Sequence, residues 1–379
     1  MPFQLTDDQL LTRDSVREFA EAEIAPIAAE IDKNHRPPLE SIPKLAEMGL
    51  LGMIIPEEYG GTGMDTVSYV IAIEELSRVC ATHGVLAEAH SSLCTWPIVN
   101  YGNAEQKQKY LPDLANGNAI GAFGLTEPNA GSDAGSTSTT AVRDGDEFVL
   151  NGQKIFITNG GFAKTFVIIA RSTDAPGAKG LSAFIVERDT AGFQVLEPEQ
   201  KMGIRGSSTT PLAFSDCRIP AANLLGNQGE GFKIAMQILD GGRTGIAAQA
   251  LGIAQGAFEA ACKYAKERVQ FGKPLAALQA IQWMIADMAV DIEAGRALVY
   301  QAADTEDRHE PHSQASAMAK LFCGEMATRV TGKAIQIHGG VGYTEAYPVE
   351  RMYRDAKITE IYEGTSEIQR LVISRNYLR

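Results

Sequence analysis

The amino-acid sequence predicts a mainly helical protein with a central β domain. Two observations support this prediction. Apolar residues recur at helical intervals through roughly the first 120 residues and again after Gly231. Between these regions, short β-rich runs alternate with Gly, Asn and Asp turns, which indicates an antiparallel barrel or sandwich rather than a doubly wound sheet. We expect an N-terminal helical domain (1–120), a middle β domain (121–231) and a C-terminal helical bundle domain (232–379).

Capping residues mark the starts of the N-terminal helices. Thr6 and Gln9 have the spacing of a capping box, and Asp65 precedes a stretch with helical periodicity. Ser41 is expected to cap a short helix that stops at Gly49. These signals predict an all-helical layer at the N-terminal end.

Turn dipeptides divide the middle region into strands. Asp144-Gly145 and Asn151-Gly152 supply the positive φ angles that tight hairpins need. Strands are therefore predicted over 148–150, 154–158, 166–170 and 181–186.

Long helical patterns return after the β-rich region. Pro311 suits the first turn of one of these helices, and a last helix follows Ser366. Four helices, three of them long, describe an up-and-down bundle. The three long patterns cover 234–268, 278–303 and 311–337.

Composition excludes several classes of partner. The chain of 379 residues has 34 Lys and Arg against 47 Asp and Glu, so its net charge of −13 disfavours nucleic acids and anionic membranes. Its five cysteines form no CxxC pair and its six histidines have no metal spacing, so we expect neither a disulfide framework nor a bound metal. No run of 18 apolar residues and no signal or transit peptide is recognisable, so a cytoplasmic, bacterial-type protein is expected. The two tryptophans, Trp96 and Trp283, are expected in the core.

Two glycine-rich clusters are candidates for binding loops. The segment 124–133 has hydroxyls, amides and a flexible backbone that suit a polar ring or a phosphate, although an elaborate turn explains it equally well. The segment 336–343 lets backbone N–H groups approach a phosphate, but a glycine-capped helix end is the simpler interpretation. A Rossmann site is excluded there because a helix, not a strand, precedes it. A P-loop motif is absent, and Ser132 has no adjacent His–Asp pair for a hydrolase triad.

The third cluster, 361–368, places a carboxylate in a bend. Glu363 precedes Gly364, and Thr365 with Ser366 can cap the helix that follows. A solvated turn explains this arrangement without any function. In a closed apolar pocket, however, Glu363 would have a raised pKa and could act as a general base.

Taken together and in order, the motifs resemble those of the acyl-CoA dehydrogenase family, and most of all its short-chain (butyryl-CoA dehydrogenase) branch. The resemblance covers essentially the whole chain. It rests on segments 125–133, 156–160, 267–273, 336–342, 354–358 and 361–367.

The resemblance implies an FAD flavoprotein that oxidises a short-chain acyl-CoA to the trans-2-enoyl-CoA, as in fatty acid β-oxidation. Glu363 would remove the α-proton while a hydride passes from the β-carbon to flavin N5. Electrons would then pass to electron-transferring flavoprotein. Relatives of the isovaleryl and long-chain types carry their base at the position of Gly242, and a glycine there supports Glu363 in that role.

The resemblance also implies a set of binding residues. Arg268, Phe271 and Gln279 match positions that reach the FAD of a neighbouring subunit, so a homotetramer built as a dimer of dimers is expected. Many relatives have Trp at the position of Phe156. The implied cofactor residues are Phe123, Gly124, Leu125, Thr126, Ser132, Phe156, Ile157, Thr158, Arg268, Phe271, Gln279, Gln336, Ile337, His338, Gly339, Gly340, Thr365, Ser366 and Glu367. The implied substrate residues are Ser132, Asp240, Gly241, Gly242, Arg243, Tyr362 and Gly364.

Two alternatives stay open at this level. An acyl-CoA oxidase shares the fold and the base but passes its electrons to oxygen. A catalytically inactive acyl-CoA-binding paralogue would share the fold alone. Peroxide production without an added acceptor would indicate the first, and a colourless protein that cannot be reconstituted with FAD would indicate the second.

Overall fold

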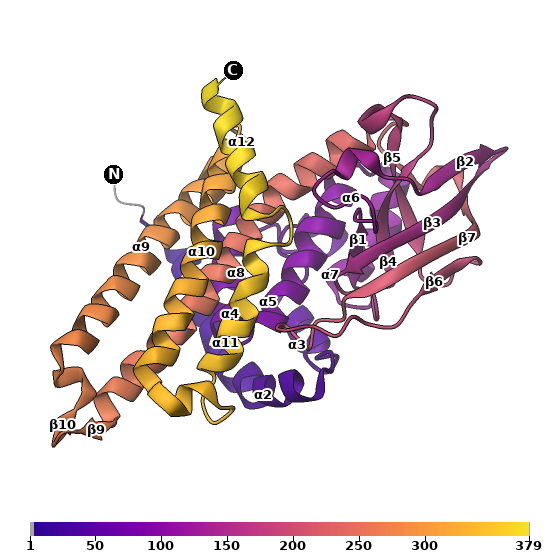
Figure 1. Ribbon diagram of the computed structural model, residues 1–379. Coiled ribbons are helices and arrows are strands. Elements are labelled where there is room, and N and C mark those ends of the chain that lie inside the picture. Colours follow the sequence, from indigo (N-terminus) through magenta and orange to yellow (C-terminus); the bar gives the residue numbers. More distant parts are fainter. Residues whose placement is uncertain (1–3, 379) are drawn as a thin grey trace.

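The chain forms helices, then a β sheet, then helices again in the computed structural model, which describes residues 4–378 (Figure 1). The sheet lies to one side of the helices, and α8 extends from the sheet along the length of the helical part. The predicted fold class is therefore confirmed.

The N-terminal region is helical, and two of its turns are π-helical. Thr6 and Gln9 form the predicted capping box, since the backbone N–H of each bonds the other's side chain, and Asp65 caps α4 through the N–H of Ser68 at 2.6 Å. The elements are α1 (Asp7–Phe19), η1 (Ala20–Ile24), α2 (Ala25–Asn34), α3 (Ser41–Glu47), η2 (Glu57–Tyr59), α4 (Thr66–Val79), α5 (Ala81–Glu88), η3 (Ala89–Thr95), α6 (Trp96–Tyr101) and α7 (Ala104–Ala115).

The capping role predicted for Ser41 is wrong. Ser41 is the first residue of α3 rather than its cap, and its hydroxyl is buried against His83, 2.9 Å from Nε2. His83, which lies 42 residues further along the chain, thus bonds the Ser41 hydroxyl that the local sequence pattern had assigned to a backbone N–H of α3.

The eight-stranded sheet has the order β6-β7-β3-β2-β4-β5-β8, with β1 paired to β4 outside this path. Most pairs are antiparallel, as predicted, but β1 runs parallel to β4 with Gly121 opposite Thr165. The strands are β1 (Gly121–Gly124), β2 (Thr140–Asp144), β3 (Glu147–Ile157), β4 (Thr165–Arg171), β5 (Leu181–Glu187), β6 (Phe193–Val195), β7 (Thr210–Pro220) and β8 (Leu224–Leu225). Short 3₁₀ turns lie at η4 (Ala134–Ser136), η5 (Gly177–Gly180) and η6 (Ala221–Asn223).

Only one of the two predicted hairpin turns forms. Gly145, with a φ of 61°, lies in the turn between β2 and β3. Asn151-Gly152 instead lies inside β3, where the pairing with β7 shifts at a bulge and Gly152 has a φ of 141°. A Cβ at Gly152 would lie 2.6 Å from Thr139 Oγ1, so the glycine permits a close strand approach rather than a chain reversal.

The C-terminal region contains the predicted long helices and an additional short helix. Pro311 precedes α10 by two residues instead of lying in its first turn, and α11 was not predicted because its eight residues span only about two turns. The elements are α8 (Gly231–Glu267), β9 (Val269–Gln270), β10 (Lys273–Pro274), η7 (Leu275–Ala277), α9 (Gln279–Asp307), α10 (Ser313–His338), η8 (Gly339–Tyr343), α11 (Val349–Ala356), η9 (Lys357–Glu360) and α12 (Ser366–Leu378).

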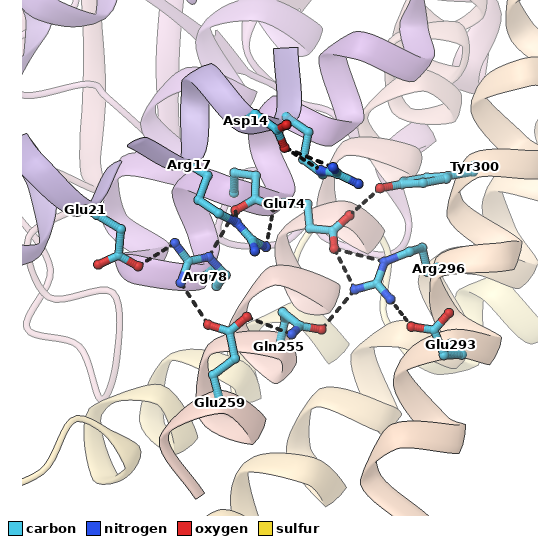
Figure 2. Close-up of polar contacts among 12 residues, drawn as sticks. Asp14, Arg17, Glu21, Glu74, Arg78, Gln255, Glu259, Glu293, Arg296 and Tyr300 are labelled. Carbon is cyan, nitrogen blue, oxygen red and sulfur yellow. Dashed lines mark hydrogen bonds and ion pairs between the residues drawn. The ribbon is translucent and has the colours of Figure 1, made fainter. Parts of the chain in front are cut away.

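A buried polar network joins the N-terminal helices to the bundle (Figure 2). Arg78 of α4 is 6% exposed and bonds Glu75, Glu21 and Glu259, the last of them on α8. Beside it, Arg296 of α9 contacts Glu74 of α4 at 2.9 Å. These ion pairs tie four elements together around α4.

Three expectations can be compared with residues 4–378: the burial of the tryptophans, membrane-spanning helices and metal-binding clusters. Trp283 is 61% exposed on α9 and Trp96 is partly buried, so the prediction that both pack in the core is wrong for Trp283. No helix in this range is long and apolar enough to cross a membrane. No group of three or more His, Cys, Asp or Glu side chains in it could hold a metal ion.

Candidate active site

Glu363 lies in the loop between η9 and α12, in a backbone conformation that is rare for its residue type. Its φ is 53°, and Gly364 follows with a φ of 100°. Lys320 Nζ donates to the Gly364 carbonyl at 2.6 Å and Gln369 Nε2 donates to the same oxygen at 2.9 Å. These two buried side chains hold the loop so that Glu363 Oε2 is buried, without a hydrogen-bond partner among the described residues.

The carboxylate of Glu363 faces a glycine on the long helix α8. A Cβ at Gly242 would lie 2.1 Å from Glu363 Oε2, so any larger residue would displace the carboxylate. Leu93 of the π-helical turn η3 lies beside the same position, with Cδ2 at 3.1 Å. The two positions at which the resemblance puts a base are therefore neighbours in space, and only Glu363 has a carboxylate.

A second buried carboxyl, which the sequence reasoning missed, lies next to Glu363. Glu88 at the end of α5 is fully buried; Ser92 donates to its Oε1, while Oε2 has no partner among residues 4–378. A Cβ at Gly245 would lie 2.7 Å from Glu88 Oε1 and 2.8 Å from the hydroxyl of Tyr69, which is also buried and unpartnered. The sequence signal available for Glu88 was a single carboxylate at the end of the apolar residues of α5.

Burial sets the protonation of the two carboxyls. It raises the pKa of Glu363 to about 7, with the nearby Glu88, Lys320 and Arg243 opposing the rise. Burial raises the pKa of Glu88 well above its usual range, and the charge of Glu363 adds to this effect. With a pKa of about 7, Glu363 is close to half ionised at neutral pH. A carboxylate with a pKa near neutrality is suited to accept a proton from carbon.

The predicted substrate residues on α8 share one turn beside this carboxylate. Arg243 is 5% exposed and pairs with Asp240, and its Nε has no partner in the described chain. Asp240 also accepts the Ser313 hydroxyl at 2.9 Å, and Gly241 faces Glu306. Burial lowers the pKa of Arg243.

The remaining predicted substrate residues have different surroundings. Tyr362 is half-buried, and its hydroxyl donates to Gln249 within the helical core. Gly364 belongs to the loop that carries Glu363, as described above. Ser132 is exposed in the loop after β1.

Two segments predicted to line the flavin come together at the sheet. Phe123 and Gly124 end β1, Leu125 and Thr126 follow them, and the Thr126 carbonyl accepts the N–H of Ile155 at 2.9 Å. Phe156, Ile157 and Thr158 are therefore adjacent to this segment. Phe156 is 58% exposed with a φ of 59°, so its ring is available to a ligand, whereas Ile157 is buried.

The start of α12 suits an anionic group. Thr365 Oγ1 accepts the N–H of Ile368 at 3.4 Å, and the Ser366 hydroxyl is buried without a partner in the described chain. Glu367 is exposed in the same first turn. A helix N-terminus presents unpaired N–H groups and a positive dipole end, which a diphosphate can complete. The exposed ring of Phe156 suits contact with the flavin ring of FAD, and the unpartnered hydroxyl of Ser366 suits a hydrogen bond to its diphosphate.

The other predicted cofactor residues lie at the far end of the bundle (Figure 1). Arg268 and Phe271 flank β9, about 40 Å along α8 from Gly242 at 1.5 Å per residue. His338 at the end of α10 joins them, since its ring stacks on Tyr264 with centroids 4.4 Å apart. The residues of this end are Arg268, Phe271, Gln279, Gln336, Ile337, His338, Gly339 and Gly340.

Within one chain, then, the structure does not bring this far group to the site around Glu363. Phe271 is 90% exposed, and the space beside Gly339 and Gly340 is open to 4 Å. His338 Nε2 is buried and unpartnered within residues 4–378.

Known proteins are similar to this chain over its whole length. Three family models match the chain: the acyl-CoA dehydrogenase N-terminal domain at residues 6–118, the middle domain at 122–217 and the C-terminal domain at 229–378. The short-chain specific acyl-CoA dehydrogenase of Clostridium acetobutylicum is 56% identical over the full length of both chains. The butyryl-CoA dehydrogenase structure from Megasphaera elsdenii is 47% identical with a TM-score of 0.98, again over all of both chains.

A chain in the structural study of the electron transferring flavoprotein of Acidaminococcus fermentans is 53% identical with a TM-score of 0.99, and both chains are fully covered. Family models, sequence relatives and solved structures thus agree over the whole length. The chain belongs to the acyl-CoA dehydrogenase family, whose members are FAD-dependent oxidoreductases.

Proposed function

We propose that the protein oxidises short-chain acyl-CoA thioesters to trans-2-enoyl-CoA, with Glu363 as the base that removes the α-proton. The observation that carries this proposal is the buried, unpartnered Glu363 Oε2, opposite Gly242 and with a pKa of about 7. Among the described residues, Oε2 has no hydrogen bond that would offset the cost of its burial. Its placement is explained by a reaction that gives it a proton.

The loop around Glu363 performs the proton transfer. An α-proton beside a thioester is a weak acid, so hydrogen-bond donors must stabilise the oxygen on which negative charge develops. Lys320 and Gln369 keep the Glu363–Gly364 backbone in place, and we assign that backbone as one such donor. FAD held between segments 123–126 and 156–158 would supply the acceptor for the hydride of the β-carbon. The buried surroundings of Glu363 exclude water from the carboxylate.

Short-chain specificity is supported by the relatives named above, which are described as short-chain specific and as butyryl-CoA dehydrogenase. The structure of the electron transferring flavoprotein contains a chain of the same fold, which supports that protein as the electron acceptor. We also propose a homotetramer, a cytoplasmic location, and domains that divide near residues 120 and 231. In a tetramer, the far group around Arg268 would complete the FAD site of a neighbouring subunit.

Anaerobic titration with acyl-CoA thioesters of increasing chain length tests the function. We expect butyryl-CoA to bleach the flavin absorbance of the purified yellow protein most completely, with electron-transferring flavoprotein reoxidising it. Rapid peroxide formation in air would identify an oxidase instead. A protein that cannot be loaded with FAD would overturn the proposal in favour of an inactive paralogue.

A further inference from the structure

A buried lysine contacts the segment that is predicted to line the flavin. It is not among the residues assigned to the cofactor site above. Lys154 is in the middle of β3 and its side chain is 0% exposed. Nζ donates to the Leu125 carbonyl at 3.0 Å and to Glu127 Oε1 at 2.7 Å. Its aliphatic stem packs on Gly124, where a Cβ would lie 3.4 Å from Lys154 Cγ. One side chain thus contacts the last residue of β1 and two positions of the segment that follows it.

Its partner, Glu127, is equally well connected. The carboxylate is 3% exposed and accepts the Ser138 N–H at 2.7 Å, the Ser138 hydroxyl at 2.6 Å and the Thr139 N–H at 3.0 Å. Burial opposes its ionisation, but the ammonium of Lys154 and the hydrogen bonds from Ser138 and Thr139 together outweigh this effect and lower the pKa of Glu127 to about 2. Burial lowers the pKa of Lys154 to about 8, against the effect of Glu127. Both groups are charged at neutral pH.

The ion pair joins the segments that face the flavin. Glu127 follows Thr126 directly, and Lys154 is two residues before Phe156 on the adjoining strand. Between them, the N–H of Ile155 bonds the Thr126 carbonyl at 2.9 Å. The Lys154–Glu127 ion pair and the Ile155–Thr126 backbone hydrogen bond therefore hold segments 125–127 and 156–158, which are predicted to line the flavin, at a fixed distance from each other.

Stability alone does not account for such a pair. Bringing two charges out of water carries a large desolvation cost, and well-packed apolar residues of similar size often stabilise a protein as much or more. Apolar residues, however, form no directional hydrogen bonds. They would therefore not hold the Leu125 carbonyl, the Glu127 turn and β3 in one relative position.

We propose that Lys154 and Glu127 are positioning residues for the flavin: their buried ion pair holds segment 125–127 and segment 156–158 at the separation that the flavin ring requires. The inference rests on the proposed FAD-dependent function. The pair acts through Thr126, Phe156 and Thr158 and does not itself contact the reacting atoms.

Lys154→Met in the full-length protein is the first test. We expect FAD to dissociate about tenfold more readily and the visible circular dichroism of the bound flavin to change, both measured at a temperature where the variant is folded. Arg296→Met is the matched control, because it removes a buried ion pair of the α4–α9 network (Figure 2), away from the sheet. It should lower the melting temperature and leave FAD affinity and the flavin spectrum as they are.

A double variant, Lys154→Met with Glu127→Gln, whose amide oxygen can still accept the N–H groups of Ser138 and Thr139, separates positioning from stability. It removes both buried charges, so we expect the melting temperature to recover while FAD binding stays weak. If FAD affinity and spectrum recover together with the melting temperature, the pair is merely structural and the proposal fails. Should Lys154→Met not fold, Glu127→Gln, which keeps the size of the side chain, gives the same readouts.

These readouts distinguish the inference from the proposed function. A wild-type protein that binds FAD but is not reduced by any acyl-CoA contradicts the function and leaves the positioning test intact. Unchanged FAD affinity and spectrum in both Lys154→Met and Glu127→Gln contradict the inference and leave the function intact.

Discussion

The loop before α12 and the hairpin after α8 both carry predicted site residues, but their surroundings are opposite. Around Glu363, polar atoms of Glu363, Glu88 and Tyr69 are buried and unpartnered within the described chain. At the hairpin, Phe271 is 90% exposed and held at a φ of 53°. The first region offers buried polar groups that a small ligand could bond, whereas the second presents an exposed aromatic surface. This difference favours the proposal that one chain supplies the base but only part of the cofactor site.

The largest effect is expected at the buried end. Glu363→Gln keeps the shape of the side chain and removes its basicity, so reduction of the flavin by butyryl-CoA should slow by about 10²- to 10⁴-fold. FAD should stay bound and the protein yellow. Stopped-flow absorbance under anaerobic conditions measures the rate.

Glu293→Gln, a carboxylate change on an exposed side chain of α9, is the control and should react like the wild type. Substantial bleaching by Glu363→Gln would show that another group takes the α-proton.

Gly242→Ala should have the next largest effect. The new Cβ would lie 2.1 Å from Glu363 Oε2, so the carboxylate must move, and a displacement of about 1 Å can cost roughly 10²-fold in rate. Gly332→Ala in α10 is a matched control, since its nearest neighbour would be Tyr353 at an ordinary 3.7 Å. A crystal structure and the reduction rate together check the prediction, and wild-type rates in Gly242→Ala would contradict the placement of the base.

The pH dependence of the reaction should report on the same carboxyl. With a pKa of about 7 for Glu363, the fraction ionised, and with it the reduction rate, should fall about 50-fold from pH 7 to pH 5. Stability should change in the other direction. The folded chain holds this proton more tightly than the unfolded chain, so the contribution of Glu363 to stability is complete below pH 4.5 and is lost as the pH rises through 7.

Reduction rates and melting temperatures measured across this pH range check both signs. A rate that is constant from pH 5 to pH 8 would contradict the assignment of Glu363. Variants of the hairpin should leave the apparent pKa where it is.

The smallest effect is expected at the exposed end. Phe271→Ala removes a ring that makes no core contact in the chain itself, so the fold should keep its stability. If a neighbouring subunit's FAD stacks on this ring, affinity for FAD should fall about fivefold, which corresponds to about 1 kcal/mol. Equilibrium dialysis against FAD measures it, with Tyr377→Ala, also an exposed aromatic, as control. Equal FAD affinity in both variants would remove the hairpin from the cofactor site.

Local patterns predicted much of the fold, and their failures have a common cause. The capping box of Thr6 and Gln9 formed because both partners lie within one helical turn. Ser41 and Asn151-Gly152 carry equally good local signals, yet His83 takes the serine hydroxyl and β7 takes the asparagine-glycine pair into a bulged strand. In each failure, a group distant in the chain competed successfully with a neighbour.

The residues of the candidate site also differ in whether the sequence pattern could identify them. Glu363 was recognisable from its motif, and the structure adds why it can be a base: Gly242, Lys320 and burial surround it. Glu88 could not be recognised, because a single carboxylate in an apolar helix has no informative spacing. Its importance follows only from its proximity to Glu363.

By itself, the sequence determined the order of helical and β regions and most helix starts, and it predicted Glu363 as the base, because periodicity, capping and motifs depend on residues close together in the chain. Only the tertiary structure decided which polar groups are buried together. The pKa of Glu363, the neighbouring carboxyl of Glu88 and the Lys154–Glu127 pair all arise from segments that meet after folding. Burial and charge act through space, and distance in space is what a linear pattern does not contain.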